Sequence, residues 1–166
     1  MRFHLQKFLE TAKTPYTASF SFNFSQADFP GYQVTEPVAG TFSAERIPEG
    51  VHISLQAVAK ADAECARCLA PVHETYTIAQ EYTVRPRDLT DVDFELPLDE
   101  NGLLDVEELV YQEVIFAVPR VLLCSPDCLG LCPICGKRKA AGCTCQPADE
   151  AAPADARLSI LKQLLS

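Results

Sequence analysis

The sequence lacks the features that would place the protein in a membrane or on a secretory route. No apolar run approaches the roughly 20 residues that a helix needs to cross a bilayer. The segment MRFHLQKFLE at the start contains neither a continuous apolar stretch nor a small-residue cleavage site, so we expect no secretory signal. We therefore expect a cytoplasmic protein without membrane association, in a compartment where thiols stay reduced.

Basic residues are also scarce. The chain has 14 Lys and Arg against 23 Asp and Glu, and its formal net charge is −9. A protein that binds nucleic acid by itself usually presents a basic face, so any RNA contact must be local or arranged by a partner. From Asp88 to Pro119 there is no Lys or Arg. This acidic stretch, with Asp91, Asp93 and Glu95, is either a solvated loop and helix face or a docking surface for a basic protein.

Apolar residues are abundant, and many of them alternate with polar residues as they do in β-strands. Of the 166 residues, 48% are apolar, which is enough to bury the core of one domain with a small appendage. Short strands are expected near 16–24 and 38–46. Even spacing of apolar residues predicts a long antiparallel hairpin of 51–64 and 71–85, with Cys65-Ala-Arg-Cys68 as its tip. Apart from the strand near 16–24, residues 1–37 are poorly patterned.

Helical signals are fewer. Asp105 precedes Glu108 by three positions, a variant of the capping box, and Pro119 ends the predicted helix. Its core face has helical spacing and consists of Val106, Leu109, Val110, Val114 and Ala117. Residues 146–156 read as a flexible linker before a short helix that carries Leu158, Leu161 and Leu165.

The predicted fold class is therefore α+β. A mostly antiparallel β-domain carries the long hairpin and one packed helix over residues 1–120. A cysteine-rich zinc-binding module follows at 121–146, and a linker with a C-terminal helix at 147–166.

The distribution of the eight cysteines indicates metal binding. Cysteines that merely fill a core would spread along helices and strands. Here two form a C-x₂-C pair and six crowd into one segment: Cys65, Cys68, Cys124, Cys128, Cys132, Cys135, Cys143 and Cys145. A C-x₂-C turn brings two thiolates to adjacent corners of a tetrahedron, and two such elements close a zinc site. The second turn, Cys132-Pro-Ile-Cys135-Gly, is the stronger signal because Pro and Gly favour a tight turn whose amides support the sulfurs.

The spacing allows two partitions. In the favoured one, Cys132, Cys135, Cys143 and Cys145 form a local site, while Cys65 and Cys68 meet Cys124 and Cys128 in a second site that fastens the cysteine-rich segment to the β-domain. In the other, Cys65, Cys68, Cys132 and Cys135 share one site and the remaining four cysteines bind nothing tightly. Spacing does not decide between the two.

The zinc is expected to be structural. A catalytic zinc keeps an open position and commonly uses His or carboxylate ligands, but His4, His52 and His73 all lie away from the main cluster. A thioredoxin-like role for Cys65 and Cys68 lacks the strand-then-helix setting of such motifs. Phosphate-binding glycine loops and serine nucleophile motifs are also missing. The run Lys137-Arg-Lys139 either compensates the charge of a four-thiolate site or contacts phosphate.

These segments resemble one known family. Cys65-Ala-Arg-Cys68-Leu-Ala-Pro71 is similar to its C-x-R-C-L-x-P turn, and Cys124 to Gly136 is similar to its C-x₃-C-x-G-L-C-P-x-C-G signature. Asp155-Ala-Arg-Leu158 resembles the D-P-R-L start of its last helix. The family is YceD, the large ribosomal RNA subunit accumulation proteins, and the resemblance covers roughly residues 38–166.

The resemblance implies a non-enzymatic factor for synthesis, processing or stability of large-subunit (23S) ribosomal RNA. The expected partner is ribosomal RNA or a pre-ribosomal particle, reached directly or through a basic ribosomal protein. The alternative from another class is a thiol-based redox or metal-sensing protein, which would show a reactive thiol pair in the absence of metal.

Overall fold

The computed structural model describes residues 1–90, 94, 96–99 and 101–145. It contains two units, Met1–Cys124 and Ser125–Ser166. In its described residues the first unit is mostly antiparallel sheet with two α-helices, so the predicted α+β class is confirmed.

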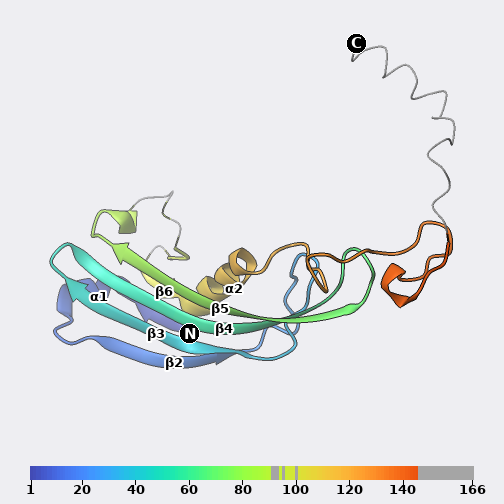
Figure 1. Cartoon of the computed structure of the whole chain (residues 1–166). Helices are drawn as coiled ribbons and strands as arrows, with labels where there is room; N and C mark the ends of the chain where they lie inside the picture. Colours follow the sequence, from blue (N-terminus) through green and yellow to red (C-terminus); the bar gives the residue numbers. More distant parts are fainter. Residues whose placement is uncertain (91–93, 95, 100, 146–166) are drawn as a thin grey trace, which may run out of the picture. The chain divides into compact units, whose positions relative to one another are not determined.

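The centre of the first unit is a curved four-stranded sheet with the order β2-β3-β4-β5, in which every neighbouring pair is antiparallel (Figure 1). The strands are β2 (Tyr16–Phe22), β3 (Val38–Ile47), β4 (Gly50–Glu64) and β5 (Pro71–Val84). The strands near 16–24 and 38–46 and the long hairpin are therefore found where the alternation of apolar residues predicts them.

The hairpin of β4 and β5 is the longest feature of the sheet. Its ladder runs from Val51 opposite Val84 to Glu64 opposite Pro71. Because successive side chains of a strand point to opposite faces, the alternate apolar residues of β4 all enter the core. Those residues are Val51, Ile53, Leu55, Ala57, Ala59 and Ala61, and each is buried. The alternation therefore fixes the register that presents the Cys65–Cys68 loop at the hairpin tip.

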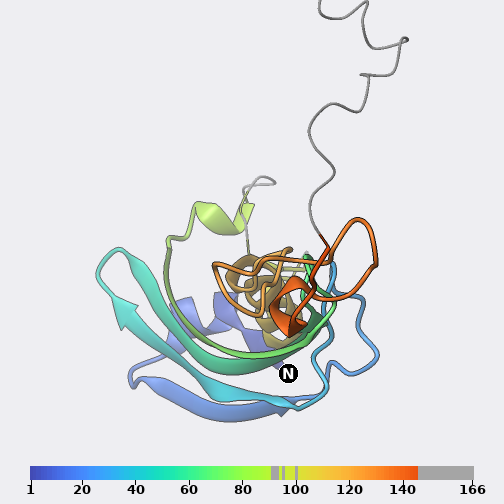
Figure 2. The same ribbon diagram turned by 45° about the vertical axis from the view of Figure 1, so that its right-hand side comes forward.

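Helix α2 (Val106–Ala117) lies in the hollow of the curved sheet and packs against β5 (Figure 2). The Asp105 carboxylate accepts hydrogen bonds from the backbone N–H groups of Glu107 and Glu108, at 3.1 and 3.5 Å, so the predicted cap is confirmed. The predicted apolar face is buried, with Ala117 only half-buried. Glu113 is buried on the same helix, which its polar side chain did not suggest.

Ordered structure also occurs in residues 1–15, where the sequence shows no clear pattern. Strand β1 (Arg2–His4) pairs with β6 (Leu103–Asp105), and α1 (Leu5–Thr11) follows it directly. A strand of three residues is too short to display alternation. Within α1, Leu5, Phe8 and Leu9 have helical spacing, but only Leu5 is buried, and two turns are too short for the pattern to stand out. These elements depend on long-range pairing rather than on local pattern.

The second unit is described as far as Cys145. Leu131 and Arg138 form an isolated antiparallel bridge, and a short 3-10 turn covers Lys139–Ala141. The predicted linker at 146–156 and the predicted final helix lie outside the described residues. So do Asp91, Asp93 and Glu95 of the acidic stretch.

Candidate metal centres

The first C-x₂-C loop closes the β4–β5 hairpin. The backbone N–H of Leu69 donates to the carbonyl of Cys65 at 2.9 Å, and the N–H of Cys65 donates to the carbonyl of Ala70 at 2.7 Å. The loop is flanked by the strand pair Glu64 and Pro71. Both cysteines of this loop are buried. The sheet thus holds two thiols close together at its end.

The second C-x₂-C loop repeats this backbone arrangement. The N–H of Gly136 donates to the carbonyl of Cys132 at 2.9 Å, and the N–H of Cys132 donates to the carbonyl of Lys137 at 2.7 Å. The flanking pair is Leu131 and Arg138, which stand at the same offsets from the first cysteine as Glu64 and Pro71 do in the other loop. The two segments therefore build the same small hairpin although they share little sequence beyond their cysteines.

The residue after the second cysteine of each loop has left-handed backbone geometry. Gly136 has φ 70°, and Leu69 has φ 58° and is the one non-glycine residue with positive φ in the described chain. Glycine adopts this conformation freely, whereas a residue with a Cβ is strained there. A strained leucine at the equivalent position shows that closing the first loop is favoured strongly enough to offset the strain.

Backbone amides also point at the first sulfur of each loop. The N–H of Cys124 donates to the Cys65 sulfur, and together with those of Arg67 and Cys68 it lowers the pKa of Cys65 to about 6. In the second loop, the N–H groups of Cys135 and Ile134 lower the pKa of Cys132 to about 6. Hydrogen bonds to a thiolate favour the charged form, which is the form that binds metal. One thiol in each loop therefore favours its ionised, metal-binding form before any ion binds.

The eight cysteines converge in two groups of four. One group is Cys65, Cys68, Cys124 and Cys128, and the other is Cys132, Cys135, Cys143 and Cys145. In each group the four sulfur atoms all lie within 4.8 Å of one another. These are the two sets of four cysteines that the favoured partition combines, and each could hold one metal ion.

The distances between the sulfurs suit a metal ion better than a disulfide. Sulfurs at the corners of a tetrahedron with bonds of 2.3 Å lie about 3.8 Å apart. Cys68 and Cys124 Sγ are 3.6 Å apart, and Cys135 and Cys143 Sγ are 3.5 Å apart. A disulfide needs about 2.05 Å, and all eight cysteines are free thiols. Both groups can hold a metal ion, and their role as ligands stays a prediction.

The thiols of the second group differ in pKa. Whereas the pKa of Cys132 is lowered, hydrogen bonds with the thiols of Cys135 and Cys143 raise the pKa of Cys145 to about 12. Several thiols this close cannot all ionise without a cation because like charges repel. A divalent ion would replace the shared protons, so its binding should release protons and strengthen as pH rises.

The Gly136 position provides a test of this geometry. A Cβ built on Gly136 meets nothing within 4 Å, so Gly136→Ala adds backbone strain without a clash. We expect about fivefold weaker metal binding, since left-handed alanine costs about 1 kcal/mol. Leu69→Gly removes the corresponding strain, so binding should tighten or stay unchanged. Competition with a chromophoric chelator measures both, and equal weakening by the two variants would contradict the shared geometry.

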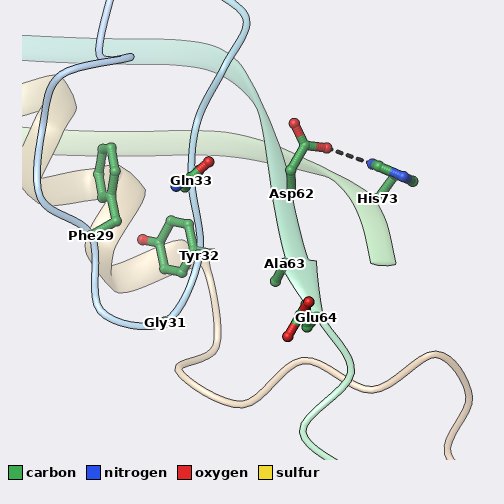
Figure 3. Close-up of a pocket in the computed structure, with 8 residues that line it drawn as sticks. All are labelled: Phe29, Gly31, Tyr32, Gln33, Asp62, Ala63, Glu64 and His73. Carbon is green, nitrogen blue, oxygen red and sulfur yellow. Dashed lines mark hydrogen bonds and ion pairs between the residues drawn. The ribbon is translucent and has the colours of Figure 1, made fainter. Parts of the chain in front are cut away.

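A second polar site lies beside the hairpin. A pocket there is lined by Phe29, Gly31, Tyr32 and Gln33 of the β2–β3 loop, by Asp62, Ala63 and Glu64 of β4, and by His73 of β5 (Figure 3). Asp62 Oδ1 lies 2.6 Å from His73 Nδ1, and Asp62 Oδ2 accepts a hydrogen bond from the Thr35 hydroxyl at 2.6 Å. Because both carboxylate oxygens are engaged, we interpret this cluster as a cross-strand contact that holds the loop to the sheet.

The pH dependence of stability tests this interpretation. Hydrogen bonds from His73 and then Thr35 hold the pKa of Asp62 below its ordinary 3.8. A carboxyl group whose pKa is lowered in the folded state stabilises the fold when the pH is above the group's ordinary pKa. This contribution disappears as the pH falls through the folded-state pKa. Asp62→Asn should therefore cost up to about 1 kcal/mol near pH 6, since exposed pairs are weak. The difference should shrink below pH 3.8 in urea unfolding, and a constant difference would contradict the assignment.

The fold and the two cysteine groups define an α+β protein whose thiols can hold metal ions. The chain belongs to the YceD family, because the model of that family, described as large ribosomal RNA subunit accumulation protein YceD, matches residues 53–165. The match includes all eight cysteines. The family name gives its members a role in large ribosomal RNA subunit accumulation and names no catalysed reaction.

Individual relatives agree with this assignment. An uncharacterized protein of Mycobacterium bovis and one of Mycobacterium tuberculosis are each 37% identical over 98 residues. The aligned region covers 55% of this chain and 46% of the relatives, so the chain spans about half the length of the curated relatives that it matches. No solved structure matches the chain. In the described part of the chain, no helix has the length and apolar character needed to cross a membrane.

Sequence reasoning identified the cysteines but missed their supports. The amides of Cys124 and Ile134 and the left-handed Leu69 all contribute to the loops. A signal existed for Leu69 alone, because it aligns with Gly136 when the two C-x₂-C loops are superimposed in sequence. A leucine does not by itself indicate a left-handed backbone, so only a comparison of the two loops could have predicted this conformation.

Proposed function

We propose that the chain is a non-enzymatic, cytoplasmic factor for synthesis, processing or stability of 23S ribosomal RNA, with one structural zinc ion in each cysteine group. Family membership supports the ribosomal role. The two groups of four converging free thiols support the metal. Residues 121–146 would then act as a zinc-binding module after the β-domain, followed by a linker and a C-terminal helix.

Zinc is the ion that this donor set fits best. Four thiolates form a soft, tetrahedral set, which zinc prefers, whereas calcium and magnesium take oxygen ligands. A set of four protein ligands leaves no position for water or substrate. The ion would therefore stabilise the fold without taking part in a reaction, as a non-enzymatic factor requires.

The exposed part of the second loop supports contact with RNA. Lys137, Arg138 and Lys139 are exposed, and the apolar side chains of Leu129 and Ile134 near them are 66% and 58% exposed. The Met1–Cys124 unit has 19 acidic and nine basic residues, whereas Ser125–Ser166 has four acidic and five basic residues. Zinc knuckles are among the modules that recognise RNA, and basic side chains contact its phosphates. We therefore propose this loop as the part of the chain that meets ribosomal RNA in a pre-ribosomal particle.

The experiment that tests the function is complementation in the source organism. Cells depleted of the protein should show a lower ratio of 23S to 16S ribosomal RNA, and the native chain should restore it. Cys132→Ser with Cys135→Ser should fail to restore the ratio, whereas Thr144→Ala, which changes the exposed residue between Cys143 and Cys145, should succeed. An unchanged ratio after depletion would remove the ribosomal role.

A further inference from the structure

A groove lies between α2 and β5, and no cysteine lines it. It is lined by Gln80 and Tyr82 of β5, by Leu96, and by Gln112, Glu113 and Phe116 of α2, and its volume is about 740 Å³. All of these residues belong to the Met1–Cys124 unit. We refer to it as the α2–β5 groove.

The base of the α2–β5 groove holds a carboxylate with a neutral partner. Glu113 is 8% exposed, and its Oε1 accepts a hydrogen bond of 2.5 Å from the Tyr82 hydroxyl. No ion pair found among the described residues includes Glu113. A largely buried carboxylate is costly without a cation, and a carboxylate can accept several hydrogen bonds. The groove therefore has unused capacity for a positively charged donor.

The rim of the groove offers an apolar contact next to this carboxylate. Phe116 is 80% exposed, the most exposed of the large apolar residues in the described chain. It follows Glu113 by three positions, so the two side chains are neighbours on one face of α2. Leu96 is buried beneath the same groove. A ligand that fits would carry a cation and an apolar group a few ångströms apart.

The charge of the chain segment that contributes Leu96 and the α2 residues to the groove favours a protein over a nucleic acid as the occupant. Between Asp88 and Pro119 there are ten acidic residues and no Lys or Arg. Phosphate groups would be repelled from this region, whereas a basic polypeptide would be attracted. Arginine suits the site because its guanidinium can donate two hydrogen bonds to a carboxylate.

We infer that the α2–β5 groove binds a segment of a basic protein, with an Arg or Lys side chain paired to Glu113 and an adjacent apolar side chain packed on Phe116. The inference rests on the proposed function in one respect: that function places such a partner in the large-subunit particle. The site itself requires neither zinc nor RNA.

An NMR titration of the isotopically labelled full chain tests the site. The probe is the synthetic peptide acetyl-Leu-Arg-Leu-Arg-Leu-amide, and the control peptide has glutamate in place of arginine. The arginine peptide should shift resonances of Tyr82, Gln112 and Phe116, and the glutamate peptide should shift none. Glu113→Gln should weaken binding about tenfold, as expected for loss of a hydrogen bond to a charged group. Glutamine can still accept from Tyr82, so the fold is preserved.

Matched variants make the outcome decisive. Glu81→Gln changes an exposed acid next to Tyr82 in the sequence and should leave binding unchanged. Phe116→Ala removes an exposed side chain without affecting the core and should also weaken binding. Absence of arginine-peptide binding, equal binding by Glu113→Gln, or equal shifts caused by the glutamate peptide or by oligouridylate would each overturn the inference. None of these results bears on zinc content or on the 23S to 16S ratio, so the proposed function is tested separately.

Discussion

Two equivalents of zinc per chain are expected in the purified protein, and Cys132→Ser combined with Cys135→Ser should reduce the content to one. The physical reason is that each group of four sulfurs lies within 4.8 Å and closes its own site. Two remaining thiols cannot hold zinc tightly at the second group, because structural sites use four ligands. Elemental analysis after gel filtration gives the stoichiometry directly.

The same variants should change the stability of the fold in a localised way. A metal that binds only the ordered state contributes its binding free energy to folding, about 10–16 kcal/mol for small zinc domains. The Ser125–Cys145 segment lacks strands of its own in the described chain, so loss of its ion should unfold that segment. Amide hydrogen exchange should show lost protection there and unchanged protection in the sheet.

Controls separate the zinc protein from a redox protein. Thr144→Ala leaves every cysteine in place and should keep two equivalents of zinc. In the native protein, thiols should react slowly until a chelator is added. A metal-free native protein with a rapidly reacting pair, such as Cys68 with Cys124 or Cys135 with Cys143, would instead favour the thiol-based alternative, since these sulfurs are 3.6 and 3.5 Å apart.

Phe42→Ala should destabilise the first unit by about 3–5 kcal/mol, the usual cost of truncating a buried phenylalanine. Phe42 is fully buried, and its ring centroid lies 5.1 Å from that of Phe3 and 6.4 Å from that of Tyr16. The substitution removes the ring on which the N-terminal strand packs. Urea unfolding followed by circular dichroism measures the loss.

The matched control for this substitution lies on the neighbouring strand. Val58 belongs to β4 but is 45% exposed, so Val58→Ala should cost well under 1 kcal/mol. Similar losses in the two variants would show that the Phe3, Tyr16 and Phe42 contact is not part of a tightly packed core. A large loss in Phe42→Ala alone would establish that β1 is fastened to the sheet through this ring.

The parts of the fold that were predictable are those with long local patterns. Alternation from Val51 to Ala61 has period two over many residues, which a strand with one buried face requires. Asp105 was recognised because a cap acts within one helical turn. The C-x₂-C spacing likewise predicted thiols in proximity, since the geometry of the loop is set by its own few residues.

The parts that were missed depend on distant partners. Pairing of Arg2 with Asp105 joins opposite ends of the first unit, and three residues are too few to reveal it. Burial of Glu113 results from its contact with Tyr82, 31 residues away, and a glutamate on a helix normally reads as solvated. The left-handed Leu69 is imposed by closure of the hairpin. In each case tertiary contacts override the local preference.

The two C-x₂-C loops differ in how well they are ordered before any ion binds. Fourteen residue pairs, from Val51–Val84 to Glu64–Pro71, lead up to the Cys65 loop, whereas the Cys132 loop is flanked by the single described bridge between Leu131 and Arg138. Ordering a backbone residue costs about 1–2 kcal/mol. At the second loop, more of this cost is subtracted from the binding free energy of the ion, because fewer contacts order the loop beforehand. Occupancy should therefore be stepwise, and in zinc starvation the exposed Lys137–Lys139 loop would lose its ion first while the sheet stayed intact.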